Sequence, residues 1–221
     1  MSLTTPSTTR RTGMHALRAL ALGGALVLAS GCSLLGGKKE APTIYAPQPT
    51  VRADPGWPAV DWQLVISSLQ VARQVDSLRI AVRPSPAEMQ VYKGASWAQR
   101  PGEMIERSLL RVLEDSGKIG GVARAGAGVD GDYRLVLDIR RFESDYAGAT
   151  LPSATIEITA KLLHAQDRDI VASRTFLHSE TAAGTNVPEV VNAFERGLGA
   201  ITRDVAGWTL SAGTRHNADH R

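Results

Sequence analysis

The chain has 221 residues, one cysteine and a formal net charge of +3. Three arginines and no acidic residue precede Cys32, so the chain from Cys32 onward holds 22 basic and 22 acidic residues and is formally neutral. This balance argues against nucleic acid as a partner, because phosphate binding needs a basic surface, and a lone cysteine cannot build a disulfide framework.

Residues 1–31 have the three-part layout of a bacterial lipoprotein signal peptide. Arginines come first, and an apolar stretch over residues 16–29 follows. That stretch is about fourteen residues long, whereas a membrane-spanning helix needs about 20, so we interpret it as a signal and not as a transmembrane anchor. The sequence Leu28-Ala29-Ser30-Gly31 then leads into Cys32, where a lipoprotein is cleaved and acylated. We therefore predict that Cys32 is the lipidation site.

The residue after the cysteine indicates which membrane holds the anchor. Ser33 stands where an Asp would be the usual inner-membrane retention signal, so the periplasmic face of the outer membrane is favoured. Acyl chains such as palmitate would hold the protein there, since each buried CH₂ contributes about 0.8 kcal/mol. The structural alternative for Cys32 is a free thiol buried on a core helix.

Residues 32–58 are predicted to form the lipidated cysteine and a proline-rich linker. Prolines at positions 42, 47, 49, 55 and 58 are too dense for a helix or a central strand. Such segments run extended at about 3.1 Å per residue, so the linker would hold the next domain away from the membrane. The folded domain is accordingly expected over residues 59–210.

The first half of this domain alternates between strand and helix patterns. Apolar residues at every second position predict strands over 60–66 and 78–83, with a short strand near 89–92. Pro101 suits the first position of a helix, an apolar stripe follows at helical spacing, and Gly117 is placed to cap the end. A glycine-rich segment comes next, with a brief strand over 119–123.

The second half contains mostly strands and then one long helix. Strands are predicted over 133–140, 155–163 and 170–178, and a hairpin loop at 164–169 joins the last two. The helix opens at Pro188 and carries apolar residues at spacings of three and four as far as Trp208. The polar tail, residues 211–221, is predicted to be disordered. These elements together predict an α/β domain with a mixed sheet.

The domain offers little catalytic or ligand-binding chemistry. Some of its side chains resemble a metal cluster: His164, Asp167, Asp169, His178 and Glu180. The two aspartates are typical turn formers, however, and no third ligand stands at a regular spacing. No Gly-x-Ser-x-Gly motif occurs, and no glycine-rich loop stands between a strand and a helix. The sequence therefore predicts no catalytic, cofactor or metal site and no enzymatic activity.

The segment before the first helix is the candidate binding surface. Tyr92, Trp97 and Arg100 lie close together there, and exposed residues of these three types are common interface anchors. They are therefore predicted to bind a partner. The structural alternative is that Tyr92 and Trp97 pack the start of the helix onto the sheet.

The order of these motifs resembles the ABC-type transport auxiliary lipoprotein family, which includes the third component of the paraquat-inducible operon. The resemblance is carried by the lipobox, the proline-rich spacer, a C-terminal helix and these segments: 78–82, Tyr92, Trp97, 101–113, 132–137 and Phe142. It covers nearly the whole chain from Cys32 onward. It implies a three-layer α/β/α domain around a mixed sheet, similar to the N-terminal domain of TolB.

The resemblance also implies a role beside a mammalian-cell-entry (MCE) type lipid transport system. In such systems an inner-membrane ABC transporter and MCE-domain proteins build a periplasmic conduit. The lipoprotein meets the conduit at the outer membrane as a docking subunit, and it can self-associate into a ring. Two other functions remain open. One is a lipid-binding carrier, which needs an apolar pocket on the order of several hundred Å³. The other is an envelope hydrolase, which the missing nucleophile motifs disfavour.

Overall fold

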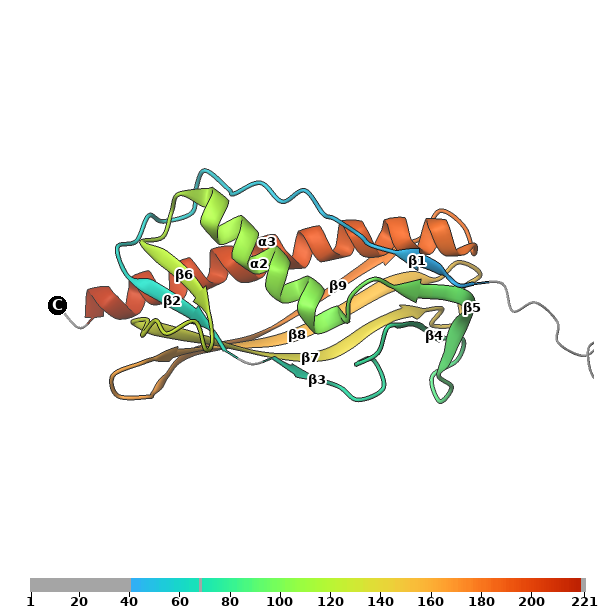
Figure 1. The fold of residues 1–221 in the computed structure, drawn as a ribbon, viewed down its shortest axis with the longest axis horizontal. Helices are drawn as coiled ribbons and strands as arrows, with labels where there is room; N and C mark the ends of the chain where they lie inside the picture. The colour runs from blue at the N-terminus through green and yellow to red at the C-terminus, as the bar shows by residue number, and fades with distance from the viewer. Residues whose placement is uncertain (1–40, 68, 220–221) are drawn as a thin grey trace, which may run out of the picture. The chain divides into compact units, whose positions relative to one another are not determined.

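The computed structural model describes residues 41–67 and 69–219, and the predicted signal peptide and Cys32 lie outside the described residues. The described residues form nine strands and two helices (Figure 1). The strands are β1 (Thr43–Tyr45), β2 (Gln63–Ile66), β3 (Gln70–Val71), β4 (Arg79–Arg83), β5 (Gln90–Trp97), β6 (Gly121–Arg124), β7 (Tyr133–Asp145), β8 (Ser153–His164) and β9 (Ile170–Thr181). The helices are α2 (Pro101–Ser116) and α3 (Val187–Asp219).

β7 organises the sheet. Along one edge it pairs in parallel with β2, β3 and β4 in turn, at residues 133–135, 138–139 and 144–145. Along its other edge it pairs antiparallel with β8, which pairs antiparallel with β9. β6 extends the sheet beyond β2, and β5 and β1 extend it beyond β4. The expected α/β class and the mixed sheet are therefore confirmed.

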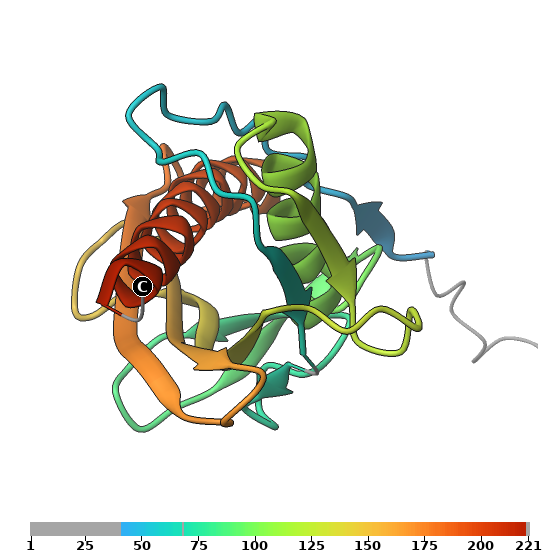
Figure 2. The same cartoon turned by 90° about the vertical axis from the view of Figure 1, so that its left-hand side faces the viewer.

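Both helices lie on the same face of this sheet (Figure 2). Ile139 of β7 reaches α2, since a Cβ added at Gly102 would lie 3.9 Å from its Cδ1. Tyr133, an even number of residues earlier on the same strand, contacts the end of α3. The opposite face is polar, with hydroxyl pairs such as Thr159 and Thr175, whose oxygens are 2.9 Å apart. Among the described residues, α2 and α3 thus cover the apolar face of the mixed sheet.

α2 begins and ends where the sequence predicts. Pro101 occupies the first turn, where its missing N–H has no helical partner. Gly117 ends the helix in the left-handed conformation with φ 59°, which glycine adopts without a steric penalty. The apolar stripe is buried at 5% exposure or less and consists of Met104, Ile105, Leu109, Val112 and Leu113.

α3 is longer than predicted, and this corrects the expectation of a disordered tail from residue 211. The helix continues to Asp219, and Ala212 within it is buried. The hydroxyls of Thr209, Ser211 and Thr214 each donate to the carbonyl four residues earlier, so this polar turn is satisfied within the helix. The end of the helix also packs against Tyr133 and Trp62, and such tertiary contacts routinely override weak helix propensity.

The proline-rich segment is part of the fold, and this corrects the expectation of a free linker up to residue 58. β1 pairs in parallel with β5, and Ala98 N donates to Tyr45 O at 2.7 Å. The chain then runs over the helices (Figure 1), where Val51 and Trp57 pack against the core. Prolines tolerate this path because an extended segment at an edge need not donate every N–H to a ladder. The folded unit therefore starts at Pro42 and not at residue 59.

Candidate functional site

Trp97 is a core residue and not a surface anchor. It ends β5 with 1% of its surface exposed. Its ring meets Phe142 of β7 and Phe194 of α3 edge-on, with ring centroids 6.0 and 5.1 Å away. Trp97 is therefore buried in the core, as the structural alternative expected, although its ring partners lie on β7 and α3 and not at the start of α2. A side chain this buried cannot anchor a partner at the surface.

Tyr92 and Arg100 occupy different environments from Trp97. Tyr92 is half-buried on β5, and its hydroxyl lies 3.0 Å from the Ser144 hydroxyl. Burial raises the pKa of the Tyr92 phenol, and the hydrogen bond with Ser144 partly opposes that shift. Arg100 precedes α2 with 54% of its side chain exposed, and it forms an ion pair of 3.2 Å with Asp76. Of the three predicted residues, Arg100 is the one that the structure presents to solvent.

A buried carboxylate next to Ser144 holds β4 against β7. Glu143 is 1% exposed and accepts from Arg83 Nε at 2.8 Å and from Arg83 Nη2 at 3.1 Å. It also accepts from Arg141 Nε at 2.8 Å, and Arg141 in turn bonds Asp145. The hydrogen bond with Glu143 raises the pKa of the Arg83 guanidinium. Both oxygens of Glu143 are thus already bound, which makes this cluster a structural one.

The residues that resembled a metal cluster are spread along the β8–β9 hairpin. His164 Nδ1 lies 3.0 Å from Asp167 Oδ1, and this hydrogen bond lowers the pKa of the Asp167 carboxyl. His178 instead contacts Asp204 of α3, with 2.9 Å between Nε2 and Oδ2. Glu180 lies 3.8 Å from the guanidinium of Arg196. No group of three or more such ligands converges among residues 41–67 and 69–219.

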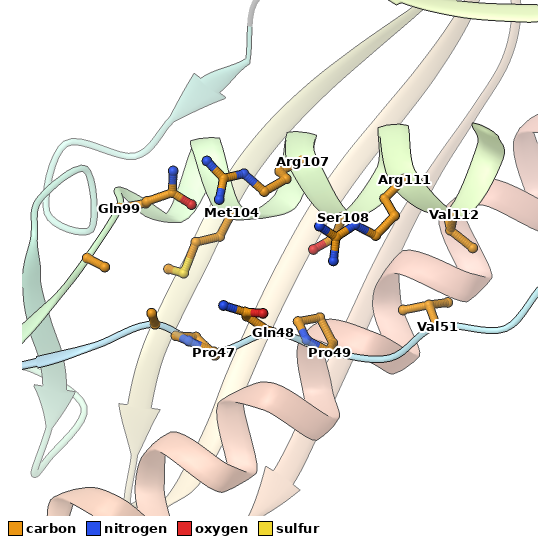
Figure 3. Close-up of a pocket in the computed structure, with 12 residues that line it drawn as sticks. Pro47, Gln48, Pro49, Val51, Gln99, Met104, Arg107, Ser108, Arg111 and Val112 are labelled. Carbon is orange, nitrogen blue, oxygen red and sulfur yellow. The ribbon is translucent and has the colours of Figure 1, made fainter. Parts of the chain in front are cut away.

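A cavity lies between the proline-rich segment and α2 (Figure 3). Its volume is about 110 Å³. The segment contributes residues 46–49 and Val51, and the approach to the helix contributes Ala98 and Gln99. α2 contributes Met104, Arg107, Ser108, Arg111 and Val112.

The helical wall of this cavity combines cationic and apolar groups. Arg107 and Arg111 stand four residues apart, so they lie one above the other on the same side of α2. Both are exposed, whereas Met104 and Val112 beside them are 5% and 2% exposed. Figure 3 shows Arg111 extending from the helix towards Gln48 and Pro49, and Arg107 running along the helix towards Gln99. Ser108 and Gln48 add groups that can donate hydrogen bonds.

Sequence reasoning missed this site because it depends on the folded position of the proline-rich segment. The four-residue spacing of Arg107 and Arg111 is visible in the sequence. On a helix without a neighbour, that spacing indicates only a solvated face. The cavity exists because residues 46–51 pack opposite the arginines, and the segment was expected to be a linker.

Comparisons with known proteins agree with this fold. A family model described as the ABC-type transport auxiliary lipoprotein component matches residues 43–206. A crystal structure of a Xanthomonas campestris protein is 50% identical, with a TM-score of 0.77, and the match covers 80% of this chain and 99% of that one. A crystal structure of an uncharacterised protein has a TM-score of 0.59 at 16% identity, covering 76% of this chain and 97% of that one, and it shows the fold alone.

A curated relative matches over a shorter region. An uncharacterised protein of Bradyrhizobium diazoefficiens is 27% identical over 116 residues, which is 52% of this chain. The match spans 31% of that protein, so about two thirds of the relative has no counterpart in it. Within residues 41–67 and 69–219, neither helix combines the length and the apolar character that crossing a bilayer requires.

Proposed function

The chain belongs to the ABC-type transport auxiliary lipoprotein family, and from this premise we propose that it is a docking subunit of an MCE-type ABC intermembrane lipid transport system. In this proposal Cys32 carries the acyl chains and tethers the protein to the periplasmic face of the outer membrane. The partners are an MCE-domain protein and its inner-membrane ABC transporter. The observation that carries the proposal is the family match, which starts at β1 and includes the proline-rich segment.

The small number of residues between the proposed anchor at Cys32 and the first strand supports a docking role. Because β1 starts at Thr43, eleven residue steps separate it from Cys32. A chain of that length reaches roughly 40 Å at most. The proposed mechanism is therefore passive: the anchor keeps the folded domain near one membrane, and its exposed surface binds the conduit.

The cavity volume favours docking over the alternative of a lipid carrier. Pockets that enclose a drug-sized ligand measure about 300–1,000 Å³. The cavity beside α2 measures about 110 Å³ and is lined by two arginines. It is too small to shield a whole acyl chain. A larger hollow of about 670 Å³ lies between α2 and β6, but it is open to solvent and its lining includes Arg111, Glu114 and Arg124, so it does not supply the enclosed apolar pocket that a carrier needs.

Crosslinking in cells tests the docking function. A photo-crosslinking residue placed at Arg100 or Leu177, both exposed, should capture an MCE-domain protein, which mass spectrometry of the tagged full-length chain would identify. The same residue at buried Phe194 is the negative control. Cys32→Ser should abolish capture and outer-membrane fractionation together. Recovery of only outer-membrane or peptidoglycan proteins would contradict the docking function.

A further inference from the structure

Arg107 and Arg111 are two neighbouring cations without an anionic partner. Neither forms an ion pair with another described residue. Glu103, Glu114 and Asp115 lie about one turn away on the same helix, and none of them forms an ion pair with either arginine. Like charges four residues apart repel each other, so this arrangement does not stabilise the helix. A bound anion would remove the repulsion.

The geometry of arginine narrows the chemistry of that anion. Each guanidinium presents a planar fork of donors that matches the paired oxygens of a phosphate or a carboxylate. Ser108 lies between the two arginines along α2 and lines the same cavity. Its hydroxyl adds a third donor to the same lining, close to Arg111 in Figure 3. The site therefore suits an oxyanion better than a neutral polar group.

The rest of the lining is apolar and accommodates the part of the ligand next to the anion. Met104 and Val112 of α2 face Pro47, Pro49 and Val51 of the opposite wall. Such a surface would exclude water from a short hydrocarbon stem. The cavity of about 110 Å³ admits a head group and the first atoms of a chain, and the remainder must stay outside.

We propose that the cavity between residues 46–51 and α2 binds the anionic head of an amphiphile, with a phosphate or carboxylate on Arg107 and Arg111 and the adjoining hydrocarbon against Met104 and Val112. The inference rests on the lining of the cavity and goes beyond the docking function. It holds whether or not an MCE-domain protein is the partner.

Titration calorimetry on the full chain carrying Cys32→Ser tests this site with three probes. These are dihexanoyl phosphatidic acid, dihexanoyl phosphatidylcholine and inorganic phosphate. Phosphatidic acid should bind, more weakly as salt is raised, and phosphatidylcholine should bind at least tenfold more weakly. Arg107→Gln and Arg111→Gln should each weaken phosphatidic acid binding roughly tenfold or more, because each removes charge-assisted hydrogen bonds.

Two variants separate the role of the cavity from that of general surface charge. Arg215→Gln removes an exposed helical arginine that lies outside this cavity, and it should leave binding unchanged. Ser108→Leu keeps both arginines and fills the cavity, so phosphatidic acid should no longer bind.

Three results would overturn the proposal. The first is equal binding of phosphatidic acid to the wild type and to the Arg107→Gln/Arg111→Gln double variant. The second is equal binding of phosphatidylcholine and phosphatidic acid. The third is equal affinity for inorganic phosphate and phosphatidic acid. That result would mean that the arginines bind a free oxyanion and that the hydrocarbon next to the head group makes no contact with the cavity. Melting curves of each variant would confirm that the fold is retained.

Discussion

Gly207 of α3 lies directly against the indole of Trp57, so that a Cβ added at Gly207 would come within 3.0 Å of Trp57 Cε2 and 3.1 Å of Cδ1. The two residues are 150 positions apart in the sequence. Their contact is one of those that fix the proline-rich segment over the helices. It leaves no room for a larger side chain on this part of α3.

Gly207→Ala should therefore destabilise the protein. Alanine normally stabilises a helix interior by about 1 kcal/mol relative to glycine. Here the new methyl group meets the Trp57 ring, and such overpacking typically costs about 1–3 kcal/mol. Gly199→Ala on the same helix is the matched control, since its Cβ would make an ordinary contact of 3.4 Å with Pro49, and it should stabilise. Denaturant unfolding of both variants measures the difference, and equal stabilisation would mean that Trp57 is not packed there.

Glu143→Gln should lower the free energy of unfolding by about 1–3 kcal/mol. The substitution keeps the shape of the side chain and removes the charge that Arg83 and Arg141 share. Both arginines are partly exposed and can turn to water, which limits the loss. Asp138→Asn, which breaks an exposed ion pair with Arg140, is the control and should change stability by less than about 1 kcal/mol. Chemical denaturation compares the two, and similar effects would contradict a special role for Glu143.

Alkaline pH should weaken the fold through the half-buried phenol of Tyr92 and the buried phenol of Tyr133. Burial raises the pKa of Tyr92 and of Tyr133 above the ordinary value of 10.0. A raised folded-state pKa means that the stabilisation is fully present below about pH 10 and is lost as the pH rises through the folded value. The ultraviolet absorbance of tyrosinate should show two late-titrating groups, and Tyr92→Phe and Tyr133→Phe should each remove one. Titration of either phenol below pH 10 would contradict its burial.

Deleting residues 212–221 should destabilise the protein although the sequence there is polar. This stretch holds Gly213, which packs on Trp62, and His216, whose Nδ1 lies 2.9 Å from the Tyr133 hydroxyl. Burying one large apolar side chain typically contributes about 1.5–3 kcal/mol, so partial exposure of both rings should cost about 2 kcal/mol. Thermal unfolding of the shortened chain measures this loss. An unchanged melting temperature would mean that the last turns of α3 do not contribute to the stability of the fold.

The features that the sequence predicts well are those that depend on residues close together in the chain. Alternation from Tyr133 to Ile139 identifies β7, and the Pro101 and Gly117 signals bound α2 within a few residues. The failures involve contacts between distant residues. The burial of Trp97 depends on Phe142 and Phe194, and the order of the proline-rich segment depends on α3. No pattern within a short stretch of sequence indicates which distant residues will pack together. The cavity beside Arg107 could therefore not be predicted either.

The position of β7 also sets the order in which the domain can fold. β2, β3 and β4 all precede β7 in the chain, and each needs it as a neighbour. β7, β8 and β9 are consecutive and antiparallel, so they close short loops and pair first. Pulsed hydrogen exchange during refolding should find amides of β8 protected before those of β2. A chain delivered N-terminus first can pair β4 with β5, but β2 and β3 would lack their neighbour until residues 133–145 had arrived. The sheet is therefore completed late and not progressively along its length.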